Sequence, residues 1–259
     1  MTKRINARRI RFAALSLSLG LLHSTPAFSQ QSQSTLAQQL LSSDSVARKA
    51  FLSVAPMAKD EIGDELRTAL VTLLIRKNMV VADASRRGLV LSTIDDPSFI
   101  AALSRKVASL QDPRAISALA EARHGGSTVI TELVRFGQAA VPALSEVAAS
   151  TGKHYDVVNH ALGALSRIVE SPQGAMLSSQ ARAQIRGVAE QRLSGQQYFT
   201  TLWRAIDLAV ALRDSALLRT VELLASDANA VRARGITDEE VVRRTQQRAS
   251  DRLRRQRLP

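Results

Sequence analysis

The sequence predicts an all-helical protein, and three observations support this fold class. Only 3% of the 259 residues are aromatic, whereas 45% are hydrophobic. β-Branched residues do not alternate with polar residues, as they do in half-buried strands. Instead, apolar residues recur at steps of three and four, which is the spacing of one helix face. The chain contains no Cys, which excludes a disulfide-stapled scaffold and any Cys-ligated metal site.

Residues 1–29 show the order of charges and apolar residues that is typical of a secretory signal peptide. Basic residues precede an apolar block at 12–22, and the segment contains no acidic residue. Ala27 and Ser29 supply the small side chains of a cleavage site, so we expect cleavage before Gln30. The apolar block is about half as long as the roughly 20 residues that span a bilayer. We therefore expect a periplasmic or secreted protein whose mature form has no transmembrane segment. A mitochondrial presequence is the alternative for an Arg-rich start, although the compact apolar block argues against it.

The formal net charge of +12 is concentrated at the two ends of the chain. The signal segment contributes +5 and residues 241–259 contribute +6, which leaves about +1 for residues 30–240. A folded body that is nearly neutral lacks the basic surface that nucleic-acid binding requires. We therefore expect no nucleic-acid partner.

Helix boundaries are indicated by Pro, Gly and capping residues. The polar segment 30–35 is expected to be a flexible leader. The Asp-Pro pairs at 96–97 and 112–113 each place a carboxylate at an N-cap and a Pro at the first helical position. Thr237-Asp-Glu-Glu240 fits a capping box. The predicted helices lie at 36–41, 44–55, 60–76, 79–87, 97–110, 113–123, 127–136, 139–149, 155–170, 177–194, 198–213, 215–226 and 237–256.

The clearest amphipathic patterns lie in the predicted helices at 155–170 and 198–213. We expect Tyr155, Tyr198 and Trp203 to lie in the core or at the edge of a groove. The apolar faces consist of Val158, Ala161, Leu162, Leu165, Ile168 and Val169 in the first helix, and of Phe199, Leu202, Trp203, Ile206, Ala209 and Val210 in the second.

Residues 109–150 resemble the sequence of a known protein family. Leu110-Gln-Asp-Pro-Arg-Ala-Ile-Ser-Ala-Leu-Ala120 is followed by Phe136-Gly-Gln-Ala-Ala-Val-Pro-Ala-Leu144. These segments resemble the HEAT-repeat family of α-solenoids, in particular its short bacterial repeats. The resemblance implies a superhelix of antiparallel helix pairs, in which each pair buries its apolar face against the next. It extends in degenerate form over residues 36–227.

The sequence offers little catalytic or metal-binding chemistry. His154 and His160 are six residues apart, which places them on opposite sides of a helix rather than at ligand spacing. His154 and Asp156 could act as a base and an acid, but a helix entrance with Asp156 in its first turn also explains them. The Gly-rich segment 124–128 lacks the Lys of a phosphate loop. We therefore predict no catalytic, cofactor-binding or metal-binding residues, whereas a deep pocket around 154–160 would favour an enzyme.

Residues 228–259 are predicted to form a linker and a basic C-terminal helix. In one interpretation this helix is a solvated cap, since terminal repeats need a polar outer face. In the other it docks on an acidic protein or an anionic surface through guanidinium groups. It has no aromatic residue on which single-stranded nucleic acid could stack. The candidate anion-binding residues are Arg243, Arg244, Arg248, Arg252, Arg254 and Arg255, followed by Arg257.

Together these patterns predict a non-enzymatic scaffold of the cell envelope that binds protein partners and needs no cofactor. The first alternative is an envelope protein that binds anionic surfaces through its C-terminal helix. The second is a lyase or hydrolase that uses a groove on the same helical scaffold.

Overall fold

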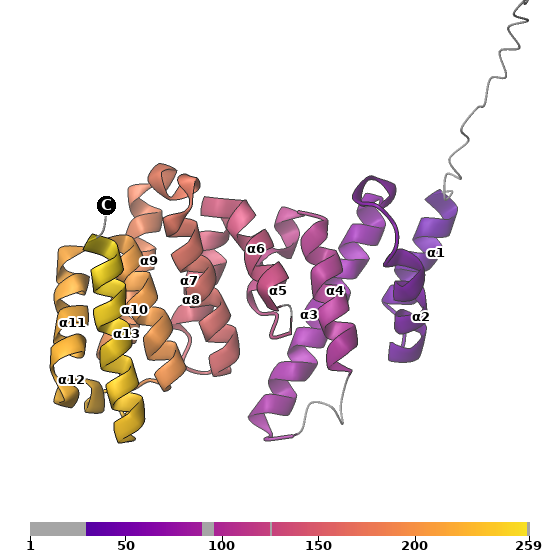
Figure 1. Ribbon diagram of the computed structural model, residues 1–259. Helices are drawn as coiled ribbons and strands as arrows, with labels where there is room; N and C mark the ends of the chain where they lie inside the picture. Colours follow the sequence, from indigo (N-terminus) through magenta and orange to yellow (C-terminus); the bar gives the residue numbers. More distant parts are fainter. Residues whose placement is uncertain (1–29, 90–95, 125, 258–259) are drawn as a thin grey trace, which may run out of the picture.

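The computed structural model describes residues 30–89, 96–124 and 126–257. These residues form helices and contain no strand, which confirms the predicted all-α class. The helices stand side by side along an elongated molecule, with α1 and α13 near opposite ends (Figure 1). The α-helices are α1 Gln30–Leu40, α2 Asp44–Val54, α3 Asp64–Arg86, α4 Pro97–Ser109, α5 Ile116–Ala120, α6 Gly126–Phe136, α7 Val141–Ala149, α8 Tyr155–Glu170, α9 Ser179–Ser194, α10 Phe199–Leu212, α11 Ser215–Ser226, α12 Ala228–Arg232 and α13 Glu239–Arg257.

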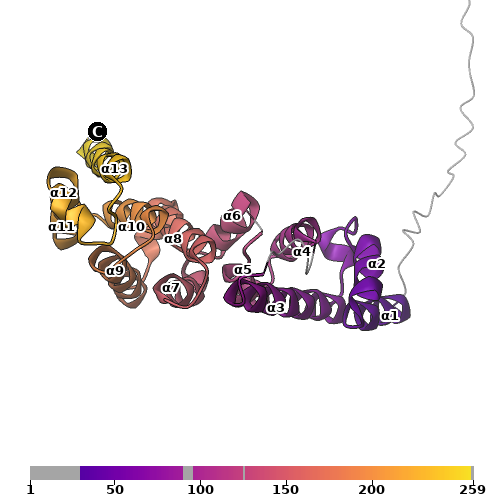
Figure 2. The same cartoon turned by 90° about the horizontal axis from the view of Figure 1, so that it is seen from below.

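From α1 to α10 the helices form two layers, and successive helices alternate between them (Figure 2). One layer contains α2, α4, α6, α8 and α10, and the other contains α1, α3, α5, α7 and α9, while α11, α12 and α13 pack together at the end of the molecule beside α9 and α10. Within a layer each helix packs on the next, as α8 does on α6 and α10. Between layers α8 packs on α7, and α10 packs on α9. The short turns between consecutive helices therefore bring neighbours in sequence together in space.

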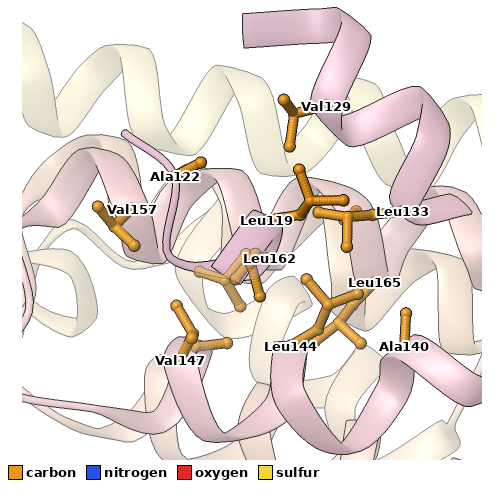
Figure 3. Close-up of a cluster of buried hydrophobic side chains, with 14 of the residues drawn as sticks. Leu119, Ala122, Val129, Leu133, Ala140, Leu144, Val147, Val157, Leu162 and Leu165 are labelled. Atoms are coloured by element: carbon orange, nitrogen blue, oxygen red, sulfur yellow. The ribbon is translucent and has the colours of Figure 1, made fainter. Parts of the chain in front are cut away.

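A continuous apolar core runs between the two layers. Figure 3 shows its middle part, where side chains from α5, α6, α7 and α8 meet. Leu119, Leu133, Leu144, Leu162 and Leu165 are all buried there. Full burial of each such side chain contributes about 1.5–3 kcal/mol. The predicted apolar face of the helix at 155–170 is confirmed, because it is the face that α8 turns to this core.

The Asp-Pro-Arg motif at 112–114 ties together two helical segments that α4 separates in sequence. Asp112 caps the 3-10 helix Pro113–Ala115, since its carboxylate accepts a hydrogen bond from the backbone N–H of Arg114 at 3.0 Å. The Arg114 guanidinium donates to Asp112 and to Asp64 of α3, each at 2.6 Å. The hydrogen bond from Arg114 lowers the pKa of Asp112. This motif therefore fixes the N-terminus of α3 against the segment that precedes α5.

Helix α3 is longer than the sequence predicts, because Lys77 and Asn78 do not form the expected break between 60–76 and 79–87. The Lys77 side chain is only 1% exposed, and its Nζ lies 3.0 Å from a carboxylate oxygen of Asp44. The Asn78 amide donates to the carbonyl of Ala118 at 2.7 Å. Both polar side chains thus bind neighbouring segments of the chain, which lets the helix continue through them.

The expected flexible leader at 30–35 is instead the beginning of α1. The Gln33 amide donates to the carbonyl of Glu61 and accepts from the backbone N–H of Gly63, both at 2.7 Å. These bonds connect α1 to the turn before α3. The predicted signal peptide and its residues Ala27 and Ser29 lie outside the described residues.

The predicted linker after residue 227 contains the short helix α12, and its chain is bonded to the body. The backbone N–H of Gln197 donates to the carbonyl of Arg234 at 2.9 Å. The predicted capping box is wrong, because α13 begins two residues later than Thr237. Asp238 caps α13 by accepting from the N–H of Val241 at 3.0 Å, and Glu240 binds arginines of the same helix.

Candidate protein-interaction surface

Four aromatic side chains and His154 form a row across the N-terminal parts of α8 and α10. We call these five residues the aromatic row. The ring centroids of His154 and Tyr155 are 4.3 Å apart, and those of Tyr155 and Tyr198 are 4.5 Å apart and nearly parallel. The row continues through Phe199 to Trp203, with steps of 5.4 and 5.2 Å. Each ring thus restricts the orientation of the next.

The middle of the aromatic row is exposed. Tyr155 is 38% exposed and Tyr198 is 54% exposed, while Phe199 and Trp203 are partly buried. The chain has only two Tyr and one Trp, and all three lie in this row. The structure therefore places Tyr155 and Tyr198 at the surface rather than in the core, and Trp203 at the edge of the core.

Helix α13 holds the Trp203 end of the row. The indole Nε1 donates to the hydroxyl of the buried Thr245 at 2.8 Å. The Arg248 guanidinium lies 5.6 Å from the centroid of the Trp203 ring, within the range of a cation–π interaction. A cavity of about 340 Å³ adjoins these groups, between Trp203 and the arginines of α13. The C-terminal helix thus forms one wall of this end of the row.

Asp207 of α10 is a buried carboxylate that two arginines of α13 share. Arg248 donates to it at 2.5 Å, and the Nε of Arg252 lies 3.0 Å from its other oxygen. Arg252 also donates to Glu170 of α8 at 3.1 Å. Two of the candidate anion-binding arginines are therefore paired with carboxylates of the body.

The remaining candidate arginines of α13 differ in their surroundings. Arg243 and Arg244 bind Glu240, and these hydrogen bonds lower its pKa to about 2. Arg254 and Arg255 are exposed and form no ion pair within the described part of the chain. The side chain of Arg257 lies outside that part. The structure thus leaves two of the six predicted residues available for an external anion.

At its other end the row meets a polar cluster around Arg123, which sequence analysis did not identify. The guanidinium of Arg123 lies 3.2 Å from Nε2 of His154 and 3.4 Å from a carboxylate oxygen of Asp156. It also donates to the hydroxyl of Ser85 at 3.2 Å. His154 is the N-cap of α8, as its Nδ1 accepts from the backbone N–H of Asp156 at 3.2 Å. Nδ1 of His154 is therefore engaged, and Nε2 faces the guanidinium of Arg123.

His124, His154 and His160 all have a lowered pKa. Desolvation is the main cause in each case, and the positive charge of Arg123 contributes at His124 and His154. His160 binds the carbonyl of Ala122, which partly offsets its desolvation. The folded protein thus favours the neutral form of all three side chains.

This burial predicts an acid-sensitive protein. Each of these histidines has a folded pKa below its ordinary value of 6.5, so the unfolded chain binds more protons as the pH falls. We expect the free energy of unfolding to be highest above pH 6.5 and to decrease as the pH falls below it. Urea unfolding at pH 7.5, 6.5 and 5.5 measures this dependence, with His160→Gln as the variant in which it becomes shallower. The lowered pKa values of Asp112 and Asp214 start from 3.8, so those groups titrate below this window. A free energy that is constant or increases over the same range would contradict the prediction.

Three further findings concern the described residues. They contain no group of three or more His, Asp or Glu side chains that could hold a metal ion. Within the same residues, no helix combines the length and the apolar character needed to cross a membrane. The Gly-rich segment 124–128 includes the start of α6, where Gly126 has a φ of +57°. Gly126 thus acts as a turn residue in a left-handed conformation, which favours Gly.

Comparisons of this chain with models of protein families, with curated proteins and with solved structures found no match.

Proposed function

We propose that this chain is a HEAT-like α-solenoid of the cell envelope that binds a protein partner and has no enzymatic activity of its own. The alternation of helices between two layers and the Asp112–Arg114 contacts support the solenoid. The signal-like pattern of residues 1–29 supports the envelope. The aromatic row is the observation that carries the binding role.

Tyr155 and Tyr198 have the properties of residues that anchor a partner. Tyr side chains are enriched at interfaces, because a ring supplies a large apolar area and its hydroxyl remains a hydrogen-bonding group. Their stacking at 4.5 Å holds both rings in place before a partner arrives. Less conformational entropy is therefore lost on binding than with two mobile side chains.

The polar groups near His154 argue against the lyase or hydrolase alternative. In general-base catalysis, the hydroxyl that loses its proton must lie within hydrogen-bond distance of the base. The Ser85 hydroxyl accepts from Arg123, and Nδ1 of His154, which would act as the base, already accepts from the backbone N–H of Asp156. This arrangement supports a binding role for the region.

The anion-surface alternative depends on Arg254 and Arg255. The other four candidate arginines of α13 are paired with Asp207, Glu170 or Glu240, and these pairs support a capping role. The two interpretations of α13 make different predictions for its removal, which are given in the Discussion.

Replacing Tyr155 and Tyr198 together by Ala tests the binding role. We expect the double variant to bind its partner about thirtyfold to several hundredfold more weakly, since interface anchors contribute roughly 1–2 kcal/mol each. Leu52→Ala is the matched control, because Leu52 is also a large exposed side chain but lies on α2, far along the chain from the row. Each protein is immobilised and used to capture proteins from the envelope fraction of the producing cell. Quantitative mass spectrometry then compares the captured proteins, and affinity measurements follow for each protein that the parent retains.

The proposed role requires a captured protein that the parent and Leu52→Ala retain equally and the Tyr variant loses. Thermal unfolding of all three proteins shows whether the double variant remains folded. Capture that is equal for the three proteins, or no saturable capture by the parent, would show that the aromatic row does not bind a partner.

A further inference from the structure

A second feature lies beside the aromatic row, namely a cavity between the C-terminal half of α3 and the N-terminus of α8. Its volume is about 430 Å³, which is in the range of small-molecule sites. The connections before α6 and before α8 complete its wall. It shares His154 with the aromatic row but does not include the exposed tyrosines.

The cavity has an apolar part that would accommodate a hydrocarbon group. Val81 of α3 and Val157 of α8 are both buried and contribute side chains to its lining, together with the methyl group of Ala82. Asn78 also lines it, but the Asn78 amide already donates to the Ala118 carbonyl. The protein itself therefore satisfies the Asn78 amide, and the apolar side chains of the cavity remain available for a ligand.

The charged groups of the lining are mainly positive. Three cations line the cavity, namely Arg86, Arg123 and Lys153, and Glu121 is its carboxylate. Lys153 binds Glu121 at 2.9 Å, and Arg123 is held by His154 and Asp156. The lining thus carries an excess of positive charge beside an apolar wall, which suits one negative charge on an apolar body.

Arg86 is the cation with the most freedom to bind an anion. Its side chain is 72% exposed, and its nearest contact with Asp83 is 3.6 Å. Its neighbour Arg87 binds the same Asp83 more closely, at 2.9 Å, and is 68% exposed, but it does not line the cavity. The two arginines therefore form a natural comparison between a cavity residue and a surface residue.

We propose that this cavity binds a small organic acid, a molecule with one carboxylate on a short apolar body. The apolar body packs against Val81, Ala82 and Val157, and the carboxylate lies near Arg86, Arg123 and Lys153. Arg123 is fixed by its contacts with Ser85 and Asp156, so it forms a preorganised part of the site. This binding is independent of the proposed partner of the aromatic row.

Titration of the protein with hexanoate tests the proposal, and hexanamide is the uncharged control of the same length. Two-dimensional ¹H–¹⁵N NMR follows both titrations. We expect saturable shifts at the C-terminal end of α3, at 121–123 and at 150–157 with hexanoate. Binding of hexanamide is expected to be at least about tenfold weaker, because charge-assisted hydrogen bonds contribute roughly 1.5–3 kcal/mol.

Three variants separate cavity binding from attraction to the surface. Ala82→Phe fills the cavity from an exposed helix position and is expected to abolish the hexanoate shifts while the protein stays folded. Arg86→Gln is expected to weaken hexanoate binding about fivefold, and Arg87→Gln is expected to leave it unchanged. The proposal is overturned if hexanoate gives no saturable shifts, or if hexanamide binds equally well. It is also overturned if Arg87→Gln weakens binding as much as Arg86→Gln, or if folded Ala82→Phe still binds.

Discussion

Replacing Leu162 by Asp is expected to lower the free energy of unfolding by about 5 kcal/mol. Leu162 of α8 is 0% exposed and lies in the part of the core shared by α5, α6, α7 and α8 (Figure 3). Loss of a buried Leu side chain alone costs about 2–5 kcal/mol, and an unpaired carboxylate in its place adds a desolvation penalty. Because typical domains are stable by about 5–15 kcal/mol, much of the helical structure is expected to be lost. Urea unfolding followed by circular dichroism measures the change.

Two control variants show whether burial is the cause. Leu162→Met conserves volume and is expected to cost less than about 1.5 kcal/mol. Leu223→Asp introduces the same charge at a 48% exposed position of α11 and is expected to change stability by less than about 1 kcal/mol. If Leu162→Asp were as stable as Leu223→Asp, the core packing described for α8 would be wrong.

Deletion of residues 241–259 is expected to lower the free energy of unfolding by several kcal/mol. The buried side chains of Val242, Ala249 and Leu253 lie in this segment, and α13 packs on both α10 and α11. Each larger apolar side chain contributes about 1.5–3 kcal/mol when it is fully buried. The deletion also removes both arginines of α13 that pair with Asp207. Thermal and urea unfolding of the truncated and full-length proteins measure the loss, and equal stability would contradict a capping role for α13.

The anion-binding interpretation of α13 needs a different variant, because truncation changes packing and charge together. Replacing Arg254 and Arg255 by Gln removes two exposed arginines of α13 that form no ion pair within the described residues. The matched control replaces Arg243 and Arg244 by Gln, which removes the same charge from arginines bound to Glu240. The two variants and the parent are compared by their adsorption to anionic vesicles at low and at physiological salt. Such attraction weakens with salt, because the Debye screening length falls to about 8 Å at 0.15 M. Selective loss in the first variant supports surface docking, and unchanged adsorption supports the cap.

Much of the helical order of this chain could be predicted from local chemistry. The Asp-Pro pairs at 96–97 and 112–113 are N-caps followed by Pro, as expected, because these interactions involve residues only one or two positions apart. The helix at 155–170 was predicted with its observed ends, since its apolar face repeats with helical spacing. By contrast, the capping box at 237–240 was wrong, because Asp238 is the N-cap and accepts from the backbone N–H of Val241, one residue beyond the donor that Thr237 would have capped.

The candidate sites could be predicted only in part. Tyr155, Tyr198 and Trp203 were expected in the core or at a groove edge, but their stacking depends on how α8 lies beside α10. Arg123 was missed because nothing within several residues of it in sequence shows that Ser85 and Asp156 are its partners. A deep pocket near 154–160 had been considered as evidence for an enzyme, and a cavity does adjoin His154. We nevertheless propose a binding role for this region, because Nδ1 of His154 already accepts from the backbone N–H of Asp156.

The sequence by itself determined most of the helical segments and the apolar faces of the helices at 155–170 and 198–213, because those properties depend on residues within one or two turns. Only the tertiary structure decided that Lys77 is buried beside Asp44, that α1 includes the expected leader, and that Asp207 pairs with α13. Each of these outcomes joins residues more than 25 positions apart, through contacts such as the one between Gln33 and Glu61. A polar side chain has the same local pattern whether it faces water or a distant partner. Its environment is fixed only when the helices pack, because burial then requires that every charge and hydrogen-bonding group find a partner.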